Sequence, residues 1–125
     1  MAVGEKKEIV AVDDSGLILI LLERVLGERY DLHTFSKARR ALEYLNNSTP
    51  DLLILDIDMP EMDGYQMLDK VKEEERLQNV PVFFLTSNND KGHVMKAAEV
   101  GVEDYVVKPI HAGTLLSKVH ALFGE

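Results

Sequence analysis

The chain has 125 residues, enough for one compact domain and too few for two. Hydrophobic residues make up 46% and charged residues 29%, which is the composition of a globular domain and argues against disorder. There is no cysteine, so disulfides, thiolate catalysis and thiolate-based zinc sites are excluded. The net charge of −8 argues against a nucleic-acid-binding surface, and no apolar run is long enough to cross a membrane. We therefore expect a soluble, cytoplasmic domain.

Strand-like and helix-like segments alternate along the whole chain. In order, the patterns predict a strand over Glu8–Asp13, a helix over Ser15–Leu26, a strand over Tyr30–Phe35, a helix over Lys37–Leu45, a strand over Asp51–Asp56, a helix over Asp63–Arg76, a strand over Pro81–Thr86, a helix over Lys91–Val100, a strand over Asp104–Val107 and a helix over Gly113–Phe123. The spacing of Asp63 and Gln66 is that of a capping box.

This alternation predicts an α/β fold, a doubly wound five-stranded parallel sheet with helices on both faces. We expect the strand order 2-1-3-4-5 of a flavodoxin-like three-layer (βα)5 domain, because that order brings the polar strand ends together. Residues 8–125 are assigned to this domain and residues 1–7 to an N-terminal extension, and we expect no output domain.

Polar residues follow four of the five predicted strands. Asp13 and Asp14 end the first strand, Asp56 ends the third, Thr86 ends the fourth, and Lys108 follows the fifth. The negative charge of three ionised carboxylates in one pocket needs nearby positive charge, which Mg²⁺ and a lysine ammonium would supply. Such a pocket suits a carboxylate that attacks phosphorus to form an aspartyl phosphate. Each residue taken singly also fits an ordinary role, such as helix capping by the acid pair.

The segments that carry these residues resemble the receiver domain of two-component response regulators. The matching segments are IVAVDDS (Ile9–Ser15), LILDIDMPEMDG (Leu53–Gly64), VFFLTS (Val82–Ser87) and DYVVKP (Asp104–Pro109). The resemblance extends from about Glu8 to Phe123 and is to stand-alone, bacterial chemotaxis-type receivers. It implies a phosphorelay protein and not an enzyme, apart from self-phosphorylation and self-dephosphorylation.

The resemblance also implies a role for each acidic residue of the pocket. Asp56 would be the phosphoacceptor, receiving its phosphoryl group from a sensor histidine kinase or a phosphotransfer protein. Mg²⁺ would be bound by Asp56, by Asp14 and by the backbone carbonyl of Asp58. Asp14 would contact the ion directly, whereas Asp13 would act mainly through water. The identities of Asp58 and Asn88 leave the phosphate lifetime open.

The remaining implied roles concern phosphate contact and output. Thr86 and Lys108 would contact the phosphoryl oxygens, and a cis peptide would join Lys108 to Pro109. Tyr105 would be the switch aromatic that moves inward when Thr86 turns toward the phosphate. A downstream protein target would bind the face formed by the fourth helix, fifth strand and fifth helix, and a phosphorylation-dependent homodimer stays open.

Two other functional readings remain. A phosphorylation-independent adaptor would keep the fold, although such proteins usually lose one of the acids or the lysine, and all are present here. The sequence Asp56-Ile57-Asp58 also matches the DxD of a Mg²⁺-dependent phosphohydrolase, in which the second aspartate is a general acid. The early position of the acid pair and the absence of room for a cap argue against that enzyme.

Two further features fall outside these motifs. The run Leu17–Leu22 spans about 600° of helix, so its six aliphatic side chains cannot all face the sheet. It is either a docking or dimer surface or is covered by neighbouring segments. The four histidines show no i, i+4 pairing of a helical zinc site and are expected at the surface: His33, His93, His111 and His120.

Overall fold

The computed structural model describes residues 6–87 and 101–125. Its elements are β1 (Glu8–Val12), α1 (Gly16–Leu26), β2 (Asp31–Phe35), α2 (Ala38–Leu45), β3 (Leu52–Asp56), α3 (Gly64–Lys72), a short 3-10 helix η1 (Glu75–Leu77), β4 (Val82–Thr86), β5 (Asp104–Val107) and α5 (Ala112–Phe123). The helix predicted over Lys91–Val100, which contains His93, lies outside the described residues, and so does Asn88.

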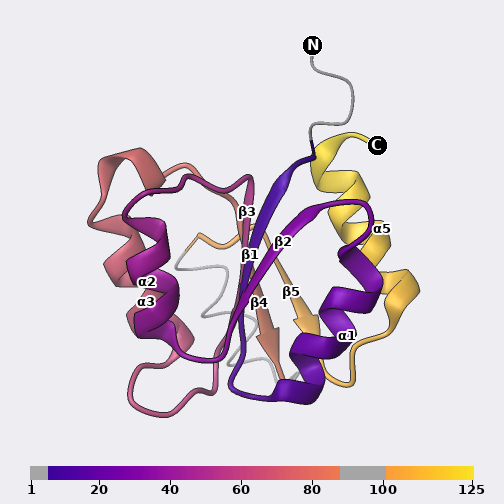
Figure 1. Ribbon diagram of the computed structural model, residues 1–125, viewed down its shortest axis with the longest axis horizontal. Helices are drawn as coiled ribbons and strands as arrows, with labels where there is room; N and C mark the ends of the chain where they lie inside the picture. The colour runs from indigo at the N-terminus through magenta and orange to yellow at the C-terminus, as the bar shows by residue number, and fades with distance from the viewer. Residues whose placement is uncertain (1–5, 88–100) are drawn as a thin grey trace.

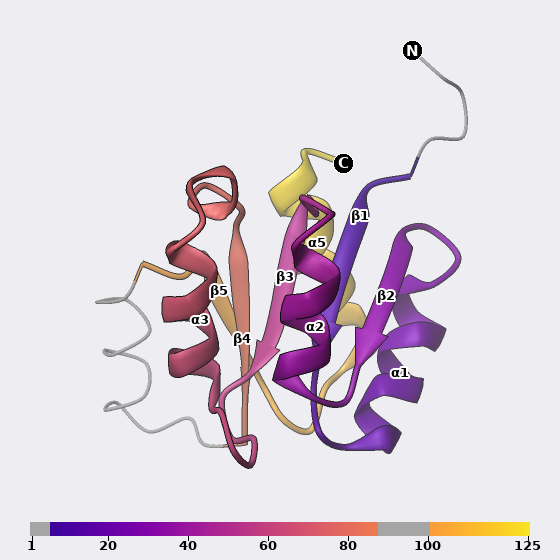
Figure 2. The same ribbon diagram turned by 60° about the vertical axis from the view of Figure 1, so that its left-hand side comes forward.

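All five strands are parallel and form one sheet in the order β2-β1-β3-β4-β5, which confirms the predicted doubly wound fold. Helices α2 and α3 cover one face, and α1 and α5 cover the other (Figures 1 and 2). In the parts of the chain that the structure describes, no helix is long and apolar enough to cross a membrane.

The core consists of two apolar clusters, one on each face of the sheet. Strand β1 supplies both, because its side chains alternate: Val10 and Val12 pack on the α2 and α3 side, and Ile9 and Ala11 on the α1 and α5 side. Every residue of the central strands β3 and β4 is buried. Continuous apolar runs of this kind are typical of strands covered by helices on both faces.

Helices α1 and α3 begin at residues whose side chains cap the helix. Ser15 Oγ accepts a hydrogen bond from the Ile18 N–H at 3.4 Å at the start of α1. At α3, Asp63 Oδ1 accepts from the Gln66 N–H and Gln66 Oε1 accepts from the Asp63 N–H, so the predicted capping box is confirmed.

The helix predicted over Asp63–Arg76 is shorter than expected. Helix α3 ends at Lys72, Glu74 is extended with φ −92° and ψ 117°, and η1 follows. The glutamates at 73–75 would place three carboxylates at the negative end of the helix dipole, which disfavours its continuation. The break also turns Leu77 into the core, where it is 2% exposed.

The aliphatic run of α1 is divided between core and solvent. Leu22 is fully buried, and Ile18, Leu19 and Leu21 pack partly against the core on the α1 side. Leu17 and Ile20 stay exposed, at 80% and 48%. Neighbouring segments therefore cover most of the run, and two side chains face solvent.

Candidate functional site

The sheet order brings the predicted polar residues to one edge. Asp13 follows β1, Asp56 ends β3 and Thr86 ends β4, and these three strands are adjacent and in register. All three side chains are buried, with exposures of 0 to 2%. Asp14 is exposed beside them. The fold thus buries two carboxylates and one hydroxyl side by side, away from most solvent.

Backbone hydrogen bonds hold the two buried carboxylates in place. The Ser15 N–H donates to Asp13 Oδ1 at 2.9 Å, and the Asp58 N–H donates to Asp56 Oδ1 at 3.3 Å. Both donors lie two residues after the aspartate that accepts. The loop after each strand therefore orients the carboxylate that ends the strand.

Gly64 permits the loop after β3 to fold back over Asp56. Its N–H donates to the Ile57 carbonyl at 2.9 Å. A Cβ at position 64 would lie 2.7 Å from the Asp56 carbonyl oxygen and 2.9 Å from Ile57 Cα, closer than a side chain can approach. The sequence shows that this glycine directly follows the α3 cap, but not that the position has no room for a side chain.

Lys108 joins the two buried aspartates from the far side of β4. Its Nζ lies 2.8 Å from Asp13 Oδ2 and 3.3 Å from Asp56 Oδ1. Its backbone N–H donates to the Thr86 carbonyl at 2.7 Å, and the Lys108–Pro109 peptide bond is cis. Burial lowers the pKa of Lys108, but the hydrogen bonds and attraction to the two carboxylates outweigh it and raise the net value.

The ionisation of Asp56 is opposed by its surroundings. Burial is the largest cause and the negative charge of Asp13 is the second, and together they raise the pKa of Asp56 to about 7. The Lys108 ammonium and the Asp58 N–H lower it only in part. One ammonium does not balance three carboxylates when Asp14 is counted, so an additional cation would relieve the site.

The arrangement fits a hard divalent cation. Carboxylate oxygens of Asp13, Asp14 and Asp56 all lie within 4.8 Å of one another. Asp56 Oδ2 is buried and accepts no hydrogen bond within residues 6–87 and 101–125. A buried carboxylate oxygen without a donor, in a group with excess negative charge, is suited to a cation that prefers oxygen ligands.

A cleft of about 520 Å³ opens beside Asp14, between the loops that follow β2 and β3. Asp14 is the member of the carboxylate group that lines it. Its lining residues are Asp14, Ser36, Lys37, Ala38, Arg39, Met59, Pro60, Glu61 and Met62. The end of β2 carries no distinctive polar motif, so its part in forming this cleft was not predicted from the sequence.

Tyr105 lies on β5 beside Phe84 of β4 and is half-buried. It packs against the core on the α2 and α3 side, and Lys118 Nζ lies 5.9 Å from its ring centroid. Lys118 also forms an ion pair of 2.8 Å with Asp104. The tyrosine therefore sits between the core and a charged surface of α5.

Comparison with known proteins agrees with this geometry. Residues 9–120 match the response regulator receiver domain. A probable cyclic di-GMP phosphodiesterase of Vibrio cholerae is 35% identical over 112 residues, which are 90% of this chain and 25% of that protein. Two-component response regulator ORR11 of Oryza sativa subsp. japonica is 35% identical over 109 residues, which are 86% of this chain and 74% of the rice protein.

Solved structures show the same fold. The chemotaxis protein CheY4 of Vibrio cholerae has a TM-score of 0.88 at 26% identity, with 94% of this chain and 98% of that chain covered. The sheet order, the matched residues 9–120 and the relatives agree. This chain belongs to the response regulator receiver domain family of two-component signalling.

Proposed function

We propose that the protein is a phosphorelay receiver in which Asp56 accepts a phosphoryl group in the presence of Mg²⁺. The observation that carries the proposal is the state of the Asp56 carboxylate. Its Oδ1 accepts from the Asp58 N–H and the Lys108 ammonium, whereas its buried Oδ2 accepts no hydrogen bond within the described part of the chain. One oxygen is anchored and the other keeps its lone pairs for attack.

The donor we propose is the phosphohistidine of a sensor histidine kinase or a phosphotransfer protein. Asp56 Oδ2 attacks phosphorus, a P–O bond forms, and the P–N bond breaks with its electron pair left on the imidazole nitrogen. Attack needs the ionised carboxylate, which the raised pKa of Asp56 disfavours when no cation is bound. Bound Mg²⁺ would supply positive charge that favours ionisation and stabilises the phosphoryl oxygens.

Four residues would hold that ion: Asp13, Asp14, Asp56 and the backbone carbonyl of Asp58. The three carboxylates are supported by their mutual proximity. Asp58 is placed next to the acceptor by the hydrogen bond from its N–H. With the ion bound, the charges of three carboxylates, one ammonium and one divalent cation sum to zero, and a phosphoryl dianion can enter.

Lys108 and Thr86 would bind the phosphoryl oxygens. The Lys108 ammonium already lies 3.3 Å from Asp56, so it can donate to an oxygen attached at that carboxylate. Thr86 is the residue after Leu85, which pairs with Asp56 across β3 and β4. Its hydroxyl can serve as a donor at the same edge.

Phosphorylation would change what the protein binds. It adds about −1.5 to −2 charges to a pocket that Lys108 and Thr86 line. Movement of Thr86 toward the phosphate would open space for Tyr105 to turn inward from its half-buried position on β5. The surface of β5 and α5 would then bind a downstream protein target, or a second copy of the chain.

The other two functions receive less support. A phosphorylation-independent adaptor has no need for the buried Asp56 beside Asp13 and Lys108, which costs folding energy. A DxD phosphohydrolase needs the Asp58 carboxyl near the reacting phosphorus. Asp58 is exposed, and it contacts Asp56 through its backbone N–H.

Intact mass spectrometry with acetyl phosphate as donor tests the proposal. We expect one phosphoryl adduct on the wild type with Mg²⁺, and none with EDTA or on Asp56→Asn. Asp69→Asn is the matched control, because Asp69 is an exposed aspartate on α3, and it should keep the adduct. A folded wild type that takes up no phosphate, or an adduct that survives in Asp56→Asn, would contradict the proposal.

A further inference from the structure

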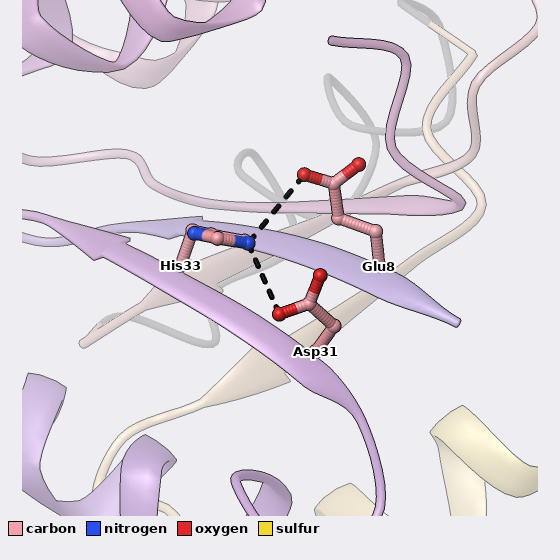
Figure 3. A group of neighbouring side chains, drawn as sticks. All are labelled: Glu8, Asp31 and His33. Carbon is pink, nitrogen blue, oxygen red and sulfur yellow. Dashed lines mark ion pairs between the residues drawn. The ribbon is translucent and has the colours of Figure 1, made fainter. Parts of the chain in front are cut away.

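A second group of polar side chains lies at the opposite end of β1 from the carboxylate pocket. Glu8 begins β1 and pairs in register with Asp31, which begins β2. His33 lies two residues further along β2, and its side chain therefore projects from the same face. Figure 3 shows the imidazole directed at both carboxylates. Asp13 lies five positions after Glu8 along the extended chain, roughly 16 Å away, so the two groups are independent.

The donor atoms have the spacing of ligands around one ion. His33 Nε2 lies 3.1 Å from Asp31 Oδ1 and 3.7 Å from Glu8 Oε2, and ligand atoms of all three residues lie within 4.8 Å of one another. Tetrahedral Zn²⁺ with bonds of about 2.0–2.1 Å places its ligands about 3.3 Å apart. The distance from His33 Nε2 to Asp31 Oδ1 is slightly shorter than this spacing, and the distance to Glu8 Oε2 is slightly longer.

Among the described residues, His33 Nε2 lies within ion-pair distance of the Glu8 and Asp31 carboxylates, an attraction that requires a protonated imidazole. Nε2 of His33 is shielded from solvent and makes no hydrogen bond of acceptable geometry with the described residues, although both carboxylates are near. A nitrogen that is close to two carboxylates but not hydrogen-bonded to either can direct its lone pair between them. Neutral imidazole with carboxylates is a donor set that suits Zn²⁺.

A surrounding set of hydrogen bonds orients these ligands. The hydroxyl of Tyr44 donates to Glu8 Oε2, and Ser48 Oγ donates to both Glu8 oxygens at 2.8 and 2.9 Å. The His33 ring stacks on the Tyr44 ring with 4.9 Å between centroids and 29° between planes. Such second-layer contacts are a regular feature of protein metal sites. The Asp31 side chain is 59% exposed, which leaves a side open for entry and for a water ligand.

We propose that Glu8, Asp31 and His33 form a second cation site that binds Zn²⁺. Two carboxylates face one imidazole, and no lysine or arginine forms an ion pair with them among the residues described. A nitrogen ligand disfavours Mg²⁺, so this site selects a different class of ion from the pocket at Asp56. The ligands come from neighbouring strands, which is why the i, i+4 spacing of a helical zinc site is not found around His33. Bound Zn²⁺ would tie the edge strand β2 to β1.

Zn²⁺ titration of the full chain by calorimetry, with Mg²⁺ in excess to occupy the Asp56 pocket, tests this proposal. The critical variant is His33→Phe, which keeps a ring to stack on Tyr44 and removes the nitrogen. The matched control is His111→Phe at an exposed histidine before α5. We expect one equivalent of Zn²⁺ on the wild type and on the control, and affinity at least about tenfold weaker in His33→Phe.

NMR resonances of the imidazole nitrogens distinguish metal binding from a purely structural role of His33. With Zn²⁺, the Nε2 resonance of His33 should shift to a metal-bound position, and that of His111 should not. Equal Zn²⁺ affinity in the wild type and His33→Phe, or an unshifted His33 resonance, would overturn the proposal. If His33→Phe does not fold, Glu8→Gln serves instead, since it keeps an oxygen for Tyr44 and Ser48, and it should show the same loss of affinity.

Discussion

Replacing Asp56 by asparagine is expected to stabilise the protein at neutral and alkaline pH when no divalent cation is present. The pKa of Asp56 rises from 3.8 to about 7 on folding, chiefly through burial and the nearby charge of Asp13. The folded state therefore keeps a proton that the unfolded state releases. The free energy of unfolding of the wild type falls as pH rises from about 4 to about 7 and is flat outside that range.

The size of this effect follows from the shift in pKa. A difference of about 3 units corresponds to about 4 kcal/mol, which is an upper bound for the stability lost between pH 4 and pH 8. Asparagine has nearly the same shape and no charge, so the variant lacks this loss. The stability advantage of Asp56→Asn should grow with pH, from near zero at about pH 4 toward that bound.

Urea unfolding followed by circular dichroism, in EDTA at about pH 4, 6 and 8, measures the advantage. The difference between wild type and variant cancels the titration of other groups, and Asp69→Asn controls for loss of one exposed carboxylate. Mg²⁺ at about 100 times its dissociation constant should then raise wild-type stability by about 2.7 kcal/mol, with a smaller gain in Asp56→Asn. An advantage that is independent of pH, or a wild type more stable than Asp56→Asn at pH 8 in EDTA, would refute the reasoning.

Three further substitutions test individual contacts. Lys108→Met should slow phosphorylation by acetyl phosphate about 100-fold at saturating Mg²⁺, because it removes the ammonium near Asp56; an unchanged rate of adduct formation by mass spectrometry would contradict that role. Gly64→Ala should lower the free energy of unfolding by about 1–3 kcal/mol, because the new Cβ meets the Asp56 carbonyl. The control is Gly113→Ala in α5, where the new Cβ meets nothing within 4 Å, and this change should raise the free energy of unfolding by up to about 1 kcal/mol. Leu53→Ala should cost about 2–5 kcal/mol in urea unfolding, since Leu53 is fully buried in β3, and a cost below 1 kcal/mol would contradict its place in the core.

Much of the fold could be predicted because its signals are local and strong. The apolar run that ends at Asp56 is typical of a strand covered on both faces, and every residue of β3 is buried. The alternation of strands with helices predicts that the strands are parallel. The strand order then places Asp13 and Asp56 at the ends of adjacent strands. The expected strand order also predicts that Lys108 joins them, and its Nζ lies 2.8 Å from Asp13 and 3.3 Å from Asp56.

Features that depend on packing or on exact register were not predictable in the same way. The end of α3 at Lys72 reflects competition between helix propensity, the repulsion of three glutamates at the helix end and the burial of Leu77. The pairing of Glu8 with Asp31 depends on the register of β1 against β2, which no local pattern in the sequence specifies. The need for glycine at position 64 appears only when the loop is seen to approach the Asp56 carbonyl.

The most direct test of the central claim is to identify the residue that carries the phosphoryl group. The wild type is treated with acetyl phosphate and Mg²⁺ and then with sodium borohydride, which reduces an acyl phosphate to the alcohol, and its peptides are sequenced by tandem mass spectrometry. We predict homoserine at position 56 and unmodified aspartate at Asp13, Asp14 and Asp58. Reduction at one of those three residues with Asp56 intact, or reduction at no aspartate, would contradict the assignment of Asp56 as the phosphoacceptor.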